Sequence, residues 1–349
     1  MSNVNLTIDG VSVEVPQGST ILDAARAANV HIPTLCFLKN VSDIASCRMC
    51  VVEVEGVQGL LPACSTLAEE GMQVTATSDE LDATRRLTLD LILSSHGLNS
   101  TNFCFSCKKN GACELQDLGR EFGMEELSFE APVKNAPVLD SNPFLSFNPN
   151  LCIACQRCVG ACNNAAGNHT LRTGKRGVRT TIQAPFGPNW KATQCESCGN
   201  CAQACPTGAF TEKRRGNYRE WEVSRVRTTC PHCGVGCQLD LIVKAVNGPS
   251  NAGLLCVKGR SGSFDFVNSP DRITSPLVKN RETGEFEPVS WDDALALVAE
   301  RFGAIKAEHG GESIAAFACS RSTNEDIYML QKMARCAFDT PNIDNCARV

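Results

Sequence analysis

Apolar and polar side chains alternate along the first fifteen residues of the chain. Apolar residues occupy every second position from Val4 to Ile8 and again from Val11 to Val15, with Asp9-Gly10 between the two runs. A period of two predicts strands, and an Asp-Gly pair favours a two-residue hairpin turn. Ser19 or Thr20 can cap a short helix that begins near Ile21. The pattern therefore predicts a strand, a turn, a strand and a helix.

Longer patterns divide the remainder of the chain. A helical periodicity runs from Asp79 to about Ser95. Residues 130–150 are rich in Pro and Asn and indicate a linker, and the charged stretch 212–219 indicates either a second boundary or a solvated loop. Beyond residue 223 the pattern becomes α/β. There we predict strands at Leu239–Val243 and Ser313–Ala318, and helices at Trp291–Phe302 and about 325–337.

Composition narrows the class of protein. The 349 residues include 22 Cys and carry a formal net charge of −5, which does not favour nucleic acid or an anionic membrane as a partner. Cysteines grouped as CxxC in a chain of this length favour metal ligation over disulfides. The N-terminus lacks a signal-peptide pattern, and no apolar run approaches the roughly 18 residues of a membrane span. A cytoplasmic protein is therefore expected.

The first cysteine group follows the predicted hairpin and helix. It consists of Cys36, Cys47, Cys50 and Cys64, with the spacing C-x10-C-x2-C-x13-C. Four thiolates can hold two irons and two bridging sulfides. The group resembles the β-grasp [2Fe–2S] domain at the start of complex I large subunits, iron-only hydrogenases and some formate dehydrogenases. A structural zinc site is the alternative.

The second group contains only three cysteines, Cys104, Cys107 and Cys113. Three thiolates leave one iron of a cubane without a protein ligand. In the same three families an upstream His completes a [4Fe–4S] cluster, and that resemblance implies His96 here. Seven residues separate His96 from Cys104, where the family pattern has three. An ordinary surface histidine is the alternative.

The third and fourth groups form the internal repeat of the chain. Each has the spacing C-x2-C-x2-C-x3-C, and in two-cluster ferredoxins the fourth Cys of each run binds the other cluster. The expected ligand sets are therefore crossed, and zinc is a remote alternative. One set is Cys152, Cys155, Cys158 and Cys205, and the other is Cys195, Cys198, Cys201 and Cys162.

The fifth group has the spacing C-x2-C-x3-C-x18-C and comprises Cys230, Cys233, Cys237 and Cys256. It resembles the N-terminal [4Fe–4S] domain of molybdenum or tungsten bis-pterin oxidoreductases. The resemblance implies that Lys258 links this cluster to a pterin, with a solvated lysine as the alternative. His232 lies inside a motif that four thiolates already complete, and no role is assigned to His31, His169 or His309. Cys319 and Cys336 are interpreted as small core residues.

The final stretch distinguishes between the candidate families. An iron-only hydrogenase would continue into its own cysteine motifs, and a complex I large subunit lacks two complete C-x2-C-x2-C-x3-C runs. Residues 320–335 and 342–349 closely resemble catalytic subunits of cytoplasmic formate dehydrogenases. That resemblance implies that a Cys or selenocysteine ligand to Mo or W follows Val349 directly, and then a catalytic His. Either a fragment or a UGA codon read as stop would explain this end. We expect no catalytic residue within the chain, and no formate turnover by it alone.

These resemblances predict an α+β multidomain chain that relays electrons for a formate dehydrogenase or CO2 reductase. Its cofactors would be one [2Fe–2S], four [4Fe–4S] and, in the full-length protein, bis-molybdopterin guanine dinucleotide with Mo or W. Expected partners are flavin or iron–sulfur subunits linked to NAD(P)H, ferredoxin or a hydrogenase. The alternatives are a non-catalytic complex I-like subunit and another bis-pterin reductase. The predicted divisions are a β-grasp domain (1–78), a one-His/three-Cys domain (79–129), a linker (130–150), a two-cluster ferredoxin domain (151–220) and a partial pterin domain with its own [4Fe–4S] cluster (223–349).

Overall fold

The computed structural model describes residues 2–96, 104, 107–130, 132, 134–184, 193–213, 223–230, 232–233, 235–240, 244–245, 255–261 and 269–345. The chain forms two compact units. Residues 1–226, 241–245 and 254–260 make the first unit, and residues 227–240, 246–253 and 261–349 make the second.

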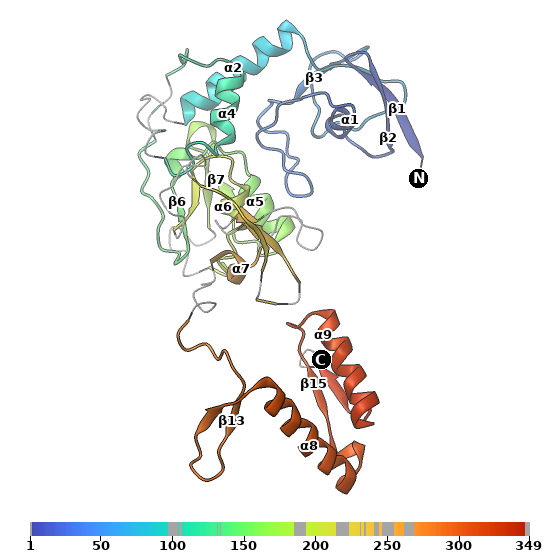
Figure 1. Cartoon of the computed structure of the whole chain (residues 1–349). Helices are drawn as coiled ribbons and strands as arrows, with labels where there is room; N and C mark the ends of the chain where they lie inside the picture. The colour runs from blue at the N-terminus through green and yellow to red at the C-terminus, as the bar shows by residue number, and fades with distance from the viewer. Residues whose placement is uncertain are drawn as a thin grey trace. The chain divides into compact units, whose positions relative to one another are not determined.

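The first unit begins with a five-stranded mixed sheet in the order β2-β1-β5-β3-β4 (Figure 1). β1 pairs antiparallel with β2 and parallel with β5, and Leu6 lies opposite Val13. Asp9 and Gly10 both have positive φ, as a two-residue hairpin turn requires, so the predicted hairpin is confirmed. The strands are β1 (Asn3–Ile8), β2 (Val11–Pro16), β3 (Val51–Val54), β4 (Leu61–Pro62) and β5 (Gln73–Thr75).

Helix α1 (Ile21–Ala27) packs against this sheet and closes a small hydrophobic core. Thr20 accepts a hydrogen bond from the backbone N–H of Asp23, and the Asp23 side chain bonds back to Thr20, which completes a capping box. Cys50 and Cys64 belong to the same core. The sheet and α1 therefore hold part of the first cysteine group inside an apolar environment.

Helix α2 (Asp79–Ser95) follows, with the bounds that its periodicity predicts and Ser78 as its N-cap. Buried Arg85 donates from Nη2 to the carbonyls of Val51 (2.9 Å) and Ala76 (2.8 Å), which ties α2 to the sheet. α2 packs beside α4 (Glu114–Glu121), as Figure 1 shows. Their shared core consists of Leu35, Met49, Leu89, Leu93, Cys113, Leu115, Leu118 and Phe122.

The remainder of the first unit consists of short helices and two-stranded sheets. Phe147 and Phe210 stack at 4.4 Å between ring centroids in its core, across the antiparallel pair β6–β9. β6 lies inside the stretch 130–150 that reads as a linker in the sequence. The elements are β6 (Leu145–Phe147), a 3-10 turn (Pro149–Leu151), α5 (Arg157–Gly160) with a π-helical extension (Ala161–Ala165), β7 (Arg172–Gly174), a 3-10 turn (Gly177–Arg179), β8 (Thr181–Gln183), α6 (Asn200–Ala204), β9 (Phe210–Glu212), β12 (Lys244–Ala245) and α7 (Val257–Ser261).

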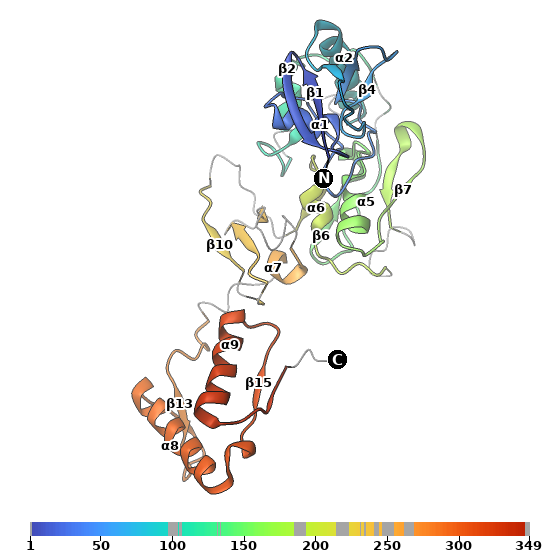
Figure 2. The ribbon, with the colours of Figure 1, turned by 90° about the vertical axis from the view of Figure 1, so that its right-hand side faces the viewer.

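The second unit contains a βαβ arrangement in which β15 and β16 run parallel and α9 connects them (Figure 2). Neither α8 nor α9 has a fully buried residue, and Trp291 and Tyr328 expose more than half of their surface. The elements are β10 (Arg227–Thr229), β11 (Gln238–Asp240), β13 (Leu277–Lys279), β14 (Phe286–Pro288), α8 (Trp291–His309), a 3-10 turn (Gly311–Ser313), β15 (Ala316–Ala318), α9 (Asn324–Met333), a π-helical turn (Ala334–Phe338) and β16 (Ile343–Asn345).

Several predicted bounds in this unit are wrong. α8 continues past Phe302 to His309, because Gly303 is tolerated inside the helix and the true stop is Gly310, at φ 78°. The predicted strand at Ser313–Ala318 is shorter, because a 3-10 turn occupies its start. The α-helix predicted to end near 337 ends at Met333 and continues as a π-helical turn. Of the strand predicted at Leu239–Val243, residues 241–243 lie outside the described residues.

Candidate iron–sulfur sites

The four cysteines of the first group lie together at the edge of the β-grasp core. The backbone N–H of Cys47 points at the Cys36 sulfur at 3.5 Å. A hydrogen bond from the Cys47 thiol lowers the pKa of Cys36 to about 6, and one from Cys64 lowers that of Cys50 to about 7. The thiolate of Cys36 also acts electrostatically on Cys50 and Cys64. The four sulfurs therefore share one site as two pairs, which suits two irons with two thiolates each.

Two residues in the loop between these cysteines have strained backbone conformations. Ala45 has φ 52° and Arg48 has φ 57°, in the left-handed region that non-glycine residues rarely adopt. Such conformations persist only where their surroundings enforce them, and they concentrate at functional sites. The loop is thus shaped around the cysteines, although its sequence contains no glycine that would announce the turns.

His96 caps the C-terminal end of α2 and is buried, with 7% of its surface exposed. Burial and, secondarily, Lys134 lower its pKa to about 4, while a hydrogen bond to the backbone of Leu151 raises it. Its Nδ1 is a buried atom with no hydrogen-bond partner in the part of the chain that the structure describes. A neutral ring with one nitrogen held by a backbone carbonyl and the other left over is the arrangement that metal-binding histidines adopt. The surface-histidine alternative is wrong, because the ring is buried.

The three cysteines of the second group influence one another. Burial raises the pKa of Cys104, and burial raises that of Cys113 to about 11. In both cases the charge of Cys107 adds to the shift. Residues 97–103, which join His96 to these cysteines, lie outside the described residues. Among the described residues the three thiols share one environment, and His96 adds a nitrogen donor without a partner.

In the paired runs, the fourth cysteine of each run lies with the other run. Burial raises the pKa of Cys152 to about 11 and raises those of Cys155 and Cys158 further, and Cys205 adds to all three shifts. Cys162, in turn, adds to the upward shifts of Cys195 and Cys201, for which burial is again the largest cause. The crossed arrangement that the repeat predicts is therefore the one in which these thiols are grouped.

The two runs also share a backbone conformation. The residue two positions after the first Cys has φ 57° in both runs, at Ala154 and Ser197. The residue four positions after it is left-handed too, at Gln156 (φ 61°) and Gly199 (φ 79°). These turns direct amides towards sulfur: the N–H of Ala154 lies 3.4 Å from the Cys152 sulfur. Hydrogen bonds to cluster sulfurs are one means by which proteins set reduction potential.

The fifth group is divided between the two units. Cys230, Cys233 and Cys237 belong to the second unit, where the N–H of Cys230 donates to the carbonyl of Cys237 at 2.8 Å. Cys256 and Lys258 belong to the first unit, on or beside α7; Cys256 is exposed and Lys258 is half-buried. The structure therefore does not gather this set within a single unit.

Hydrogen bonds connect the ligand loops of the first unit. Lys109 donates from Nζ to the carbonyl of Cys205 at 3.1 Å, and the N–H of Glu114 donates to the carbonyl of Pro206 at 3.1 Å. These contacts join the second cysteine group to the end of the fourth. A Cβ on Gly208 would lie 2.5 Å from the Cys107 sulfur, so these two loops also touch where only glycine fits.

A buried arginine joins the first group to the same assembly. Arg157 Nη1 donates to Glu114 Oε2 at 2.6 Å and reaches the carbonyl of Leu35 at 3.4 Å. Leu35 precedes Cys36, Glu114 follows Cys113, and Arg157 precedes Cys158. One side chain therefore contacts the neighbours of cysteines from three groups.

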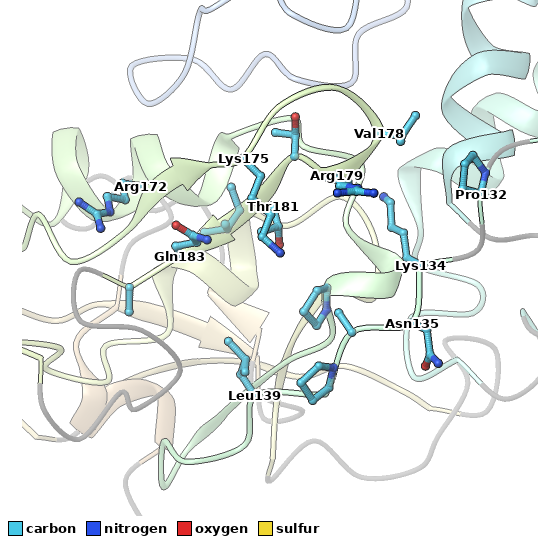
Figure 3. A pocket seen from close by; sticks show the side chains of 16 residues that line it. Pro132, Lys134, Asn135, Leu139, Arg172, Lys175, Val178, Arg179, Thr181 and Gln183 are labelled. Atoms are coloured by element: carbon cyan, nitrogen blue, oxygen red, sulfur yellow. The ribbon is translucent and has the colours of Figure 1, made fainter.

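A cavity of about 770 Å³ lies beside the Cys152 run, between the β7–β8 hairpin and the segment before β6 (Figure 3). Its lining includes Lys134, Arg172, Lys175 and Arg179, and none of its lining residues is acidic. Lys134 Nζ donates to the carbonyl of Cys152 at 2.6 Å. In a chain of net charge −5, this cavity has a positive local potential, which suits an anionic group better than a cation. Within the described ranges, no three His, Cys, Asp or Glu side chains surround a single-ion site.

Comparison with known families extends these observations. Residues 1–79 match the 2Fe-2S iron-sulfur cluster binding domain, residues 85–127 the NADH-ubiquinone oxidoreductase-G iron-sulfur binding region, and residues 142–211 the ferredoxin-like domain of NADH-quinone oxidoreductase subunit 3. Residues 223–269 match the molybdopterin oxidoreductase Fe4S4 domain, and residues 272–349 match molybdopterin oxidoreductase. The chain belongs to the molybdopterin oxidoreductases. It combines a [2Fe–2S] domain and ferredoxin-like [4Fe–4S] domains with the start of the molybdopterin oxidoreductase domain.

Relatives of this molybdopterin oxidoreductase chain have several names. It is 38% identical to a G-type NADH-quinone oxidoreductase subunit, the second of that type, from Rhizobium meliloti, across 99% of this chain and 40% of the relative. It is 36% identical to the NADPH-Fe(3+) oxidoreductase subunit alpha of Geobacter sulfurreducens, with the same coverage. It is 31% identical to a Staphylococcus haemolyticus protein named "Putative formate dehydrogenase SH0748", across 98% of this chain and 39% of that protein. The chain thus spans about two fifths of the length of these relatives.

A solved structure resembles the chain as well. The crystal structure of an NAD+-reducing [NiFe]-hydrogenase in the H2-reduced state aligns with a TM-score of 0.56 and 32% identity, over 62% of this chain and 89% of that one. None of the described helices is both long and apolar enough to cross a membrane. The chain is an iron–sulfur electron-transfer module of an oxidoreductase family whose related proteins are subunits of multi-subunit electron-transfer complexes.

Proposed function

We propose that this chain is the electron-relay portion of a formate dehydrogenase catalytic subunit. It would pass electrons between a Mo or W bis-pterin site and partner subunits. The observation that carries the relay is the set of hydrogen bonds joining each ligand loop of the first unit to the next, through Arg157, Lys109 and Glu114. Such contacts keep neighbouring clusters at fixed separations, which one-electron transfer requires.

The proposed ligands follow the groups described above. The first group would hold the [2Fe–2S] cluster, with Cys36 and Cys47 on one iron and Cys50 and Cys64 on the other. The [4Fe–4S] sets would be His96 with Cys104, Cys107 and Cys113; Cys152, Cys155 and Cys158 with Cys205; Cys195, Cys198 and Cys201 with Cys162; and Cys230, Cys233 and Cys237 with Cys256.

The chemistry of the donors supports these assignments. Burial raises the pKa of most of the grouped thiols, so a buried thiolate in these groups requires a nearby cation. Iron supplies that charge and deprotonates a coordinating thiol. His96 fits in the opposite sense, because its lowered pKa keeps the ring neutral and its buried Nδ1 lacks a partner among the described residues.

In this mechanism the clusters, when bound, each take up and release one electron, and the protein provides ligands, separation and local charge. Lys109 and Arg157 hold adjacent ligand loops together and place positive charge near them. Amides such as that of Ala154 point at sulfur and stabilise the thiolate. Lys258 would stand between the Cys256 cluster and a pterin, donating from its ammonium group.

Formate is the substrate favoured by residues 320–335 and 342–349, which resemble formate dehydrogenase catalytic subunits, and by the Staphylococcus relative at 31% identity. One rival has specific support. The Rhizobium relative, named as an NADH-quinone oxidoreductase subunit, is 38% identical, which favours a relay subunit without formate chemistry. Under that alternative the clusters would serve the same role, but no formate would be oxidised.

The full-length protein distinguishes these functions. Under the proposal it contains about one Mo or W and two pterin dinucleotides per chain, and it reduces a dye when formate is added. Pterin without formate-dependent reduction would overturn the substrate, and absence of both metal and pterin would favour the complex I-like subunit. Sequencing the codons after Val349 adds a check: we expect a Cys or selenocysteine codon followed by a His codon.

The proposed partners are subunits that carry flavin or further iron–sulfur clusters and exchange electrons with NAD(P)H, ferredoxin or a hydrogenase. Relatives named as subunits of larger oxidoreductases, and the similarity to an NAD+-reducing [NiFe]-hydrogenase chain, support this class of partner. Co-purification of the tagged full-length protein, followed by flavin analysis of the complex, tests it. A protein purified alone that still reduced NAD+ with formate would contradict the need for such a subunit.

A further inference from the structure

Arg260 is a buried cation that the cysteine spacing does not reveal. It lies on α7, and its side chain is only 2% exposed. Its backbone N–H donates to the carbonyl of Cys256 at 3.0 Å, so it stands one helical turn after the last cysteine of the fifth group. Lys258 on the same short helix is only half-buried. The two cations that follow Cys256 therefore have different environments, and only Arg260 is enclosed by protein.

Every hydrogen bond of the Arg260 side chain described here goes to the region of the fourth cysteine group. Nε donates to the carbonyl of Cys198 at 2.8 Å, and Nη2 donates to Asn200 Oδ1 at 3.0 Å and Gln203 Oε1 at 2.6 Å. Nη1 donates to Glu212 Oε1 at 3.2 Å, on β9. Four bonds from three nitrogens fix the planar guanidinium, as a flexible ammonium could not be fixed. The side chain thus fastens the Cys256 helix to the loop and helix that carry Cys198 and Cys201.

A difference between the two cysteine runs supports this role independently. Gly199 has φ 79°, and a Cβ there would lie 2.1 Å from Cδ of Arg260. The matching position of the first run is Gln156, which is also left-handed but has a side chain. The repeat therefore requires a left-handed residue in both runs, but it requires glycine only where the arginine side chain passes over the backbone.

We propose that Arg260 is a positioning residue for electron transfer between the Cys256 cluster and the cubane of Cys195, Cys198, Cys201 and Cys162. It holds the two ligand segments at a fixed separation, and its buried charge raises the reduction potential of that cubane above the value it would otherwise have. Positive charge stabilises the reduced cluster, which carries one more electron. Each transfer moves a single electron from one cluster to the other and no proton. The inference rests on the proposed relay and identifies the residue that controls one of its steps.

The charge of Arg260 is only partly offset by its surroundings. Glu212 is its one acidic partner among the described residues, and the other acceptors are a carbonyl and two amides. Glu212 stands on β9, away from the Cys198 loop, whereas Nε of Arg260 touches that loop directly. The nearer charge determines the sign of the effect on the cubane.

The test uses the full-length holoprotein and an EPR-monitored redox titration of its clusters. Arg260→Gln should shift the midpoint potential of one [4Fe–4S] cluster downward and leave the other clusters unchanged. Arg260→Lys keeps the charge, so it should restore most of that potential, yet it loses the fork and should still slow electron passage from the Cys256 cluster in freeze-quench experiments. Arg179→Gln, which removes an exposed arginine of the same unit, should change neither quantity.

Unchanged potentials in Arg260→Gln at full iron content would overturn the proposal, as would equal shifts in all clusters. Should Arg260→Gln lose iron, Arg260→Lys and Gly199→Ala decide the question. Gly199→Ala displaces the arginine and should lower the same potential, whereas a normal potential in both variants together with normal electron passage would contradict the positioning role. The titration requires only the clusters, so it remains informative even if the protein proves inactive on formate.

Discussion

Acidification is predicted to destabilise the cluster-free protein through His96. Its pKa is about 4 in the folded chain, against an ordinary value of 6.5, and burial is the main cause. A folded-state pKa below the unfolded one means that full stability is present above pH 6.5 and is lost as the pH falls towards 4. At about 1.4 kcal/mol per pKa unit, the loss is about 3 kcal/mol across that window. It is a large fraction of the stability of an ordinary domain.

Urea unfolding followed by circular dichroism at a series of pH values measures this loss. His96→Leu should abolish the component between pH 6.5 and 4, because no proton then binds preferentially to the unfolded state. His31→Gln is the matched control, since His31 is exposed and its removal should leave the component in place. An identical pH dependence in the parent chain and in His96→Leu would refute the reasoning, because the buried ring would then contribute nothing.

The same residue predicts an effect on the reconstituted protein. If His96 completes a [4Fe–4S] set, then His96→Ala should lower the iron content from about eighteen to about fourteen per chain. His96→Cys should restore most of that iron, because a thiolate can replace the imidazole. Full iron in His96→Ala would show that the histidine is a buried core residue and no ligand.

Three further substitutions follow from single contacts. Gly208→Val should eliminate the EPR signal of the Cys107 cluster, because a Cβ at that position already lies 2.5 Å from the Cys107 sulfur, whereas Gly119→Val at an open position should not. Arg85→Met should lower the free energy of unfolding by about 1–3 kcal/mol in urea titrations, because two buried carbonyls lose their donor. Phe210→Ala should cost about 3–5 kcal/mol by the same method, with loss of its stack on Phe147, and a smaller effect than Phe210→Leu would contradict that packing.

Local signals account for the parts of the fold that were predictable. The hairpin and the bounds of α2 follow from strict alternation, a turn dipeptide and Ser78 as a cap, all within a few residues of the elements that they define. α8 was predicted too short because Gly303 resembles a stop, while the true stop, Gly310, terminates the helix with a positive φ. The start of β15 was missed because the choice between a 3-10 turn and a strand at residues 311–315 depends on contacts with residues 339–342, such as that of Thr340 with the carbonyl of Ile314.

For the sites, spacing located the thiols but not what surrounds them. The repeat predicted that Cys205 lies with the first run, because each run is a copy of the other. The burial of His96 could not be inferred from a histidine seven residues before Cys104. Arg260 was missed because its partners lie 48 to 62 residues away in the sequence, and the Gly199 difference between the runs was the only local sign of it.

Quantification of iron and acid-labile sulfide in the anaerobically purified full-length protein, combined with EPR spin counting, tests the five-cluster relay most directly. The account predicts about eighteen irons and a similar amount of sulfide, with signals from one [2Fe–2S] and four [4Fe–4S] clusters. Zinc in place of iron, or an iron content near half of that value with the cysteines intact, would contradict it.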